Sequence, residues 1–144
     1  MAAPDSQAYS QSHSQSHSPS SAFVGAAWLA LIIGVAMYLV GLFNATMALN
    51  EKGYYLTLLL YGLFAAVSVQ KSTRDRMEGI AVTSMYFGLC WLSVLAALGL
   101  LTVGLMNATI APSEKGFYAM SFVLSLFAAI TVQKNVRDGV PAAA

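Results

Sequence analysis

GLFNATMALNEKGYYLTLLLYGLFAAVSVQKSTRD, at residues 41–75, recurs as GLMNATIAPSEKGFYAMSFVLSLFAAITVQKNVRD at residues 104–138. More than half of the aligned positions are identical, and the matches include the charged residues near both ends of the block. The same register continues upstream to Trp28 and Trp91, so each copy holds two apolar segments. We therefore expect two tandem copies of a helical hairpin.

The composition places these hairpins in a membrane. Hydrophobic residues make up 58% of the chain and charged residues only 9%, whereas soluble domains carry about 25% charged residues. Four long stretches hold no charge at all. The sequence therefore predicts an all-α polytopic membrane protein with four transmembrane helices. Its first partner is the lipid bilayer. The nearly balanced charge predicts no nucleic-acid partner.

The two repeats are expected at residues 22–75 and 85–138. Their helices are predicted, in chain order, at about residues 22–43, 53–70, 81–106 and 116–133. The second and fourth apolar runs span only about 24 Å as helices, less than a hydrocarbon core of about 30 Å. Flanking lysines that reach the interface would relieve this mismatch.

The ends of the chain are different in character. Residues 1–21 are rich in Ser, Gln and His and cannot bury enough apolar surface to offset the entropy of ordering. We predict a disordered cytoplasmic tail there and a short C-terminal tail at residues 139–144. His13 and His17 are four residues apart, but this stretch has little reason to be helical, so neither a metal nor a cofactor is expected.

Lysines and arginines set the expected orientation. Five of them lie after the second and fourth segments, against only Lys52 and Lys115 on the opposite side. The positive-inside rule then places both termini and the central loop in the cytoplasm. Since each copy crosses the membrane twice, the two copies form a parallel repeat.

Small residues recur every fourth position in the first segment, at Ala26, Ala30 and Gly34. Such a row allows another helix backbone to come close. Packing inside the bundle is the favoured interpretation, and dimerisation through this row is the alternative.

A first polar motif surrounds the turn inside each repeat. Asn44 and Asn107 follow an apolar segment and are expected to cap its C-terminal end, although both also fit the Asn-x-Ser/Thr glycosylation pattern. Asn50 and Ser113 are expected to begin the next helix as N-caps. The rival interpretation makes the two turns one external site. The candidate site residues of this motif are Asn44, Glu51, Lys52, Asn107, Glu114 and Lys115.

A second polar motif, Gln-Lys-x-x-Arg-Asp, ends each repeat. It is expected to continue the helix into the cytoplasm, where Lys71 and Asp75 can pair one turn apart. A positive anchor at the headgroups is the favoured role and a surface for a partner protein is the alternative. The candidate residues are Gln70, Lys71, Arg74, Asp75, Gln133, Lys134, Arg137 and Asp138.

None of the four apolar spans contains Asp, Glu, Lys, Arg or His. Ionisable residues inside a membrane commonly mark proton or ion pathways, so their absence argues against a proton-coupled exporter. No Ser/His/Asp or Cys/His constellation and no phosphate-binding glycine loop is present in the sequence. An enzyme is not expected.

The motifs Asn50-Glu51-Lys52-Gly53-Tyr54-Tyr55 and Gln70-Lys71-x-x-Arg74-Asp75 carry a family resemblance, together with their counterparts in the second copy. With them the chain resembles the YiaA/YiaB-type bacterial inner membrane proteins, built from the YiaAB two-helix domain, and most of all the four-helix members. The resemblance covers about residues 22–139. It implies a bacterial inner-membrane location and two tandem hairpins, but it supplies no reaction, ligand or catalytic residue.

Two functions are therefore carried forward. The first is a non-enzymatic structural or accessory protein that acts through helix packing and its basic faces, with a second copy or another membrane protein as partner. The alternative is a small transporter or channel for a neutral solute or ion, with Asn44, Asn107, Glu51 and Glu114 at its outer mouth.

Overall fold

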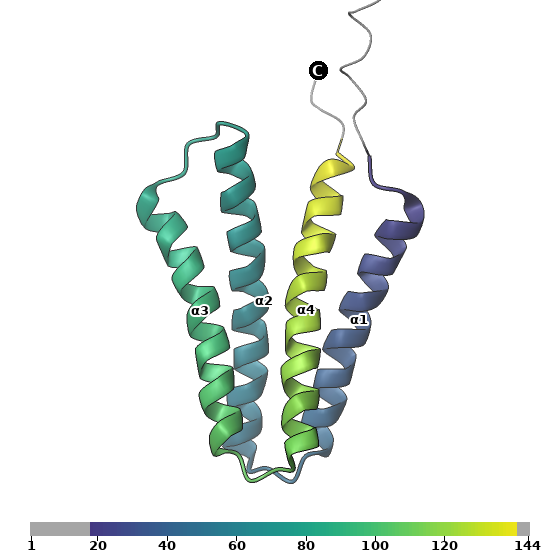
Figure 1. Ribbon diagram of the computed structural model, residues 1–144, viewed down its shortest axis with the longest axis vertical. Coiled ribbons are helices and arrows are strands. Elements are labelled where there is room, and N and C mark those ends of the chain that lie inside the picture. Colours follow the sequence, from purple (N-terminus) through teal and green to yellow (C-terminus); the bar gives the residue numbers. More distant parts are fainter. Residues whose placement is uncertain (1–17, 141–144) are drawn as a thin grey trace, which may run out of the picture.

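A computed structural model describes residues 18–140 of the chain. Its helices are α1 (Ser21–Asn44), α2 (Leu49–Met77), α3 (Ser84–Asn107) and α4 (Pro112–Asp138). All four are long and apolar enough to cross a membrane. The predicted all-α fold with four transmembrane helices is confirmed (Figure 1). The expected disorder of residues 1–17 and the expected tail at 141–144 lie outside the described residues.

The helix starts differ in detail from the expected ones. Ser20 lies inside the segment predicted as tail, yet its hydroxyl accepts from the N–H of Phe23 at 3.3 Å and caps α1. Asn50 and Ser113 are not N-caps, because α2 and α4 begin one residue before them. Instead, the carboxylates of Glu51 and Glu114 accept from the N–H groups of Ala48 and Ala111, both at 2.9 Å. This half of a capping box lets each helix start earlier.

The second and fourth helices are also longer than the predicted 53–70 and 116–133. A helix of the length of α2, 29 residues, reaches about 43 Å. The charged motifs continue the helices as expected, because their i,i+4 charge pairs support helical backbone. The helices themselves are therefore not too short for the membrane, although their apolar runs still end at Val69 and Val132.

The two helices of one repeat are not packed as a hairpin. In Figure 1 the helices stand in the order α3, α2, α4, α1, and α1 lies against α4 while α3 lies against α2. The central pair, α2 and α4, joins the two halves. Ala45 and Ala108, which follow α1 and α3, both have extended backbone, so the two turns leave their helices in the same way. Each repeat thus completes its packing with the other repeat.

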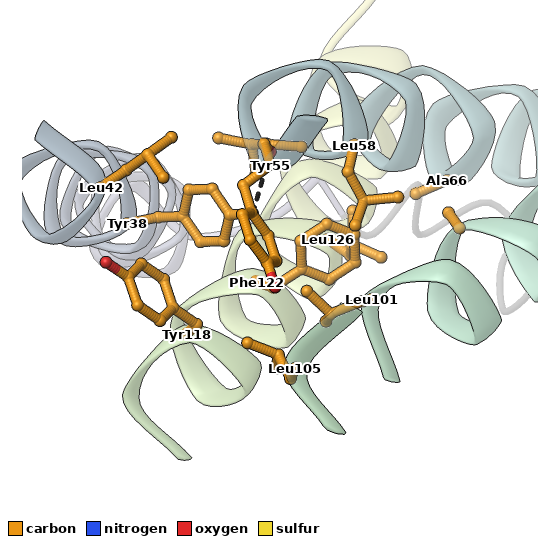
Figure 2. Packing of buried hydrophobic residues seen from close by; sticks show 12 residues of the cluster. Tyr38, Leu42, Tyr55, Leu58, Ala66, Leu101, Leu105, Tyr118, Phe122 and Leu126 are labelled. Carbon is orange, nitrogen blue, oxygen red and sulfur yellow. Dashed lines mark hydrogen bonds between the residues drawn. The ribbon is translucent and has the colours of Figure 1, made fainter. Parts of the chain in front are cut away.

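The hydrophobic core lies toward the end that carries the turns at residues 45–48 and 108–111, here called the turn end. Tyr38 of α1 and Phe122 of α4 are fully buried there. The hydroxyl of Tyr38 donates to the carbonyl of Tyr55 at 2.9 Å, which ties α1 to α2 (Figure 2). Tyr118 meets Tyr38 edge to face, with ring centroids 5.6 Å apart. The core therefore takes residues from all four helices.

Close approach of α1 and α4 depends on Gly34. A Cβ placed on it would lie 2.7 Å from Ser125 Oγ and 3.1 Å from the Ser125 backbone nitrogen. The predicted row is only partly used, because Ala26 is exposed and Ala30 is half-buried while Gly34 is buried. The buried stripe runs instead through Ala27 and Gly34, a seven-residue spacing typical of helices packed at a shallow angle. Packing inside the bundle is the observed role of Gly34.

We predict that Gly34→Ala destabilises the folded protein by about 1–3 kcal/mol, the usual cost of overpacking a tight contact. Gly25→Ala, on the same helix, is the matched control, because nothing lies within 4 Å of its Cβ position. Thermal unfolding in detergent measures both. Adding Ser125→Ala removes the nearest obstructing atom and is expected to recover part of the loss. Equal behaviour of the Gly25 and Gly34 variants would contradict the contact between α1 and α4.

Candidate functional site

The repeated Lys-x-x-Arg-Asp motifs meet where α2 and α4 end, here called the charged end. Arg137 donates to the Asp75 carboxylate at 2.7 Å, and Arg74 donates to Asp138 in the reciprocal contact. Each aspartate also pairs with the lysine one turn earlier in its own helix, Lys71 at 2.8 Å and Lys134 at 2.7 Å. The arginine of each repeat thus binds the aspartate of the other. The i,i+4 pairing of Lys71 with Asp75 agrees with the predicted one.

Glu78 joins this network, although the sequence reasoning did not single it out. It accepts from Arg74 at 2.8 Å and from Arg137 at 2.7 Å. The signal that could have found it is its position four residues after Arg74. The corresponding position of the second copy is Pro141, so Glu78 has no carboxylate counterpart there. This single carboxylate bridges both arginines.

The network lies beyond the apolar runs of α2 and α4 and is partly shielded from water. Only 9% of the Asp75 side chain and 14% of the Asp138 side chain are exposed. Hydrogen bonds from Lys71 and Arg137 hold the pKa of Asp75 below its usual value, and Lys134 and Arg74 do the same for Asp138. Both aspartates are therefore charged at neutral pH.

Four further polar residues of α2 and α4 near the charged end are buried or half-buried, and Arg76 contacts α3. Gln70 and Gln133, at the same repeat position, are half-buried. Arg76 stands over the ring of Phe87 at 4.3 Å, a cation–π contact that joins α2 to α3. Asn135, which the sequence reasoning also missed, is 3% exposed, and its side-chain nitrogen and oxygen have no hydrogen-bond partner among the described residues. Its repeat equivalent is the buried Ser72.

The turn end carries two pockets that repeat the same construction. A pocket of about 430 Å³ places Glu51, Tyr54 and Tyr55 of the first repeat beside Gly104 and Asn107 of the second. In a second pocket, of about 360 Å³, the first repeat supplies the asparagine and the second repeat supplies the glutamate and the aromatic residues. It is lined by Gly41, Asn44, Ala45, Ser113, Glu114, Phe117 and Tyr118. The two have no lining residue in common, so the turn end carries two composite pockets, whereas the rival interpretation of the sequence had one shared site.

Asn44 and Asn107 each end their helix through the side chain. Their amide nitrogens donate to the carbonyls of Val40 and Val103, both at 2.8 Å. The expected capping therefore uses a side-chain hydrogen bond in place of a left-handed backbone. Lys52 donates to the carbonyl of Phe43 at 2.9 Å and secures the same turn, while Lys115 is half-buried.

A family model described as a yiaA/B two helix domain matches the chain twice, at residues 23–75 and 86–138. The chain is 54% identical to the Inner membrane protein YiaA of Escherichia coli (strain K12), over 83% of this chain and 82% of that protein. It is 31% identical to the Inner membrane protein YiaB of the same organism, over 70% of this chain and 86% of that protein. It is 40% identical to the Uncharacterized membrane protein YubF of Bacillus subtilis (strain 168), over 40% of this chain and 67% of that protein. No solved structure matches it.

We predict that the charged end stabilises the fold at neutral pH and stops doing so in acid. Because the pKa of Asp75 and of Asp138 is lowered in the folded state, their contribution is present above the ordinary carboxyl pKa of about 3.9 and is lost as pH falls through the lower folded value. Thermal unfolding in detergent between neutral pH and pH of about 3 measures this. The double variant Asp75→Asn, Asp138→Asn is expected to be less stable at neutral pH and to lose most of the acid dependence.

Charge exchange tests whether the contact runs between repeats. Arg74→Asp alone is expected to lower the melting temperature, and adding Asp138→Arg is expected to restore part of it. Adding Asp75→Arg in place of Asp138→Arg is the comparison, because Asp75 pairs with Arg137. Equal recovery by both second changes would contradict the reciprocal arrangement.

Proposed function

The chain belongs to the yiaA/B two helix domain family, and from that premise we propose that it is a non-enzymatic accessory protein of the bacterial inner membrane. It would act by packing against a second copy or another membrane protein. The family membership confirms the resemblance that the repeated motifs carry. The multi-pass inner-membrane location follows from the relatives and from the four apolar helices.

The observation that carries this proposal is that the arginines and aspartates of the charged motifs bind one another between α2 and α4. At the charged end, Arg74 and Arg137 are committed to the aspartates of the opposite repeat and to Glu78. Charged groups that hold helices together in this way support a structural role better than a catalytic one. The tightly packed aromatic core at the turn end, around Tyr38 and Phe122, points in the same direction.

The outer faces of α1 and α3 are the surfaces that a partner would meet. Ile33 on α1 and Leu95 on α3 are exposed, as are apolar neighbours along each helix. Gly88 and Gly99 of α3 have open space above them, so another backbone could approach closely there. A membrane partner would replace lipid on these faces.

The proposed orientation places the charged end in the cytoplasm. Lys71, Arg74, Arg76, Lys134 and Arg137 all belong to that end, and Lys52 and Lys115 belong to the turn end. This distribution supports an inward-facing charged end through the positive-inside rule.

We predict that an impermeant maleimide added to intact cells labels Thr46→Cys but not Ala81→Cys. Both positions are exposed, and they belong to turns at opposite ends of the helices. Cys90, which is buried, is replaced by Ala in both variants to remove the native thiol. Ala81→Cys is expected to react only after the membrane is permeabilised. The reverse labelling pattern would invert the proposed orientation.

The alternative function, a transporter or channel for a neutral solute or ion, has one observation in its favour. The two pockets at the turn end place a carboxylate and an amide where a solute could first bind. Both pockets lie at the turn end of the bundle. Flux in proteoliposomes that is lost in Glu51→Gln with Glu114→Gln would favour this alternative over an accessory role.

For the accessory role, a photo-activated residue at Ile33 or Leu95 is expected to give protein adducts in native membranes. Phe127 of α4, which is 66% exposed on a central helix, provides a comparison position outside the proposed interface. Adducts are read as mass shifts on gels and identified by mass spectrometry. Lipid adducts alone from Ile33 and Leu95, as from Phe127, would remove the proposal.

A further inference from the structure

The turn end holds the two described carboxylates that lack an ion pair. Among residues 18–140, Asp75, Glu78 and Asp138 are all in salt bridges at the charged end, and the same part of the chain offers no salt bridge to Glu51 or Glu114. Both are exposed and line pockets at the turn end of the bundle. A carboxylate without an ion-pair partner is available to a cationic ligand.

The pocket beside Glu51 offers hydrogen-bond acceptors. Glu51 takes the Ala48 N–H through one carboxylate oxygen, which leaves the other available. The Asn107 amide nitrogen donates one hydrogen to the carbonyl of Val103, and the Asn107 side-chain oxygen is a further acceptor. The Tyr54 hydroxyl donates to the carbonyl of Leu100 at 2.6 Å. The free oxygen of Glu51 and the Asn107 oxygen are therefore acceptors for a ligand that carries hydrogen-bond donors.

The same pattern is present in the second pocket. Glu114 accepts the Ala111 N–H, and Asn44 donates its amide nitrogen to Val40. Phe117 stands where the first pocket has Tyr54, and Tyr118 stands where it has Tyr55. Acceptors beside aromatic rings suit an organic cation, which the ring faces also attract.

A bare metal ion fits this arrangement less well than an ammonium group. Ca²⁺ takes six to eight oxygen ligands, commonly including several carboxylates, and each pocket has one carboxylate. In residues 18–140, no group of three or more His, Cys, Asp or Glu side chains could hold a metal ion. A primary ammonium has three N–H donors for the free acceptors.

We propose that each of the two pockets binds one primary ammonium group, so that the chain takes two. The headgroup of an aminophospholipid is one source of this group, because the pockets lie at the ends of apolar helices where headgroups sit. A free primary amine is the other source. Since each pocket is built from both repeats, binding requires the exchanged packing of the whole chain. The proposal does not rest on the accessory function.

Native mass spectrometry of the detergent-solubilised full chain tests this with defined lipids. Phosphatidylethanolamine is expected to give up to two adducts on the unaltered protein. Phosphatidylglycerol, which has no ammonium group, is expected to bind about tenfold more weakly, as expected for loss of a charged hydrogen bond. Ethanolamine alone is added in a separate arm, because binding there without lipid adducts would assign the pockets to a soluble amine.

Three variants make the test specific. Glu51→Gln and Glu114→Gln are each expected to lose one adduct and together to lose both, and Gln still accepts the capping N–H. Glu78→Gln, at the charged end, is the matched control and is expected to keep two. Melting temperatures of all variants report whether the fold is intact. Adducts that persist in a folded Glu51→Gln, Glu114→Gln protein, or equal binding of phosphatidylglycerol, would overturn the proposal.

Discussion

Two arginine–aspartate ion pairs join α2 to α4 at the charged end, and in each pair the two residues come from different repeats. Lipid cannot solvate a charge, so the chain keeps its ionisable residues outside the apolar runs. Just beyond those runs, Arg74 reaches Asp138 and Arg137 reaches Asp75. Small residues such as Ala66 and Ala129 are buried in the helices below. The central pair is thus joined by charge at one end and by packing along its length.

At the turn end, too, each local feature is built from residues of both repeats. Because α1 lies on α4 and α3 lies on α2, the Asn of one repeat comes beside the Glu of the other. A hairpin whose two helices packed on each other would have placed Asn44 near Glu51. The composite pockets and the reciprocal ion pairs therefore have one cause. Neither feature belongs to a single repeat.

Much of this fold can be predicted from the sequence, but the choice of which helices pack together cannot. The four apolar spans, the tandem repeat and the pairing of Lys71 with Asp75 all depend on local composition and helical spacing. Which helix lies against which depends on tertiary packing, such as the contact of Gly34 with Ser125, and a repeat pattern is compatible with either arrangement. Glu78 was missed because it has no counterpart in the second copy.

The two copies differ at a position in the buried core, where Tyr38 of the first copy corresponds to Leu101 of the second. Tyr38 bonds to the carbonyl of Tyr55, whereas its repeat equivalent is Leu101, which has no hydroxyl to donate. This hydrogen bond between α1 and α2 therefore has no copy between α3 and α4. The Arg and Asp that both copies keep are different, because each repeat supplies half of both contacts: Arg74 with Asp138 and Arg137 with Asp75. A change of Arg or Asp in one repeat alone therefore breaks an ion pair that the other repeat shares.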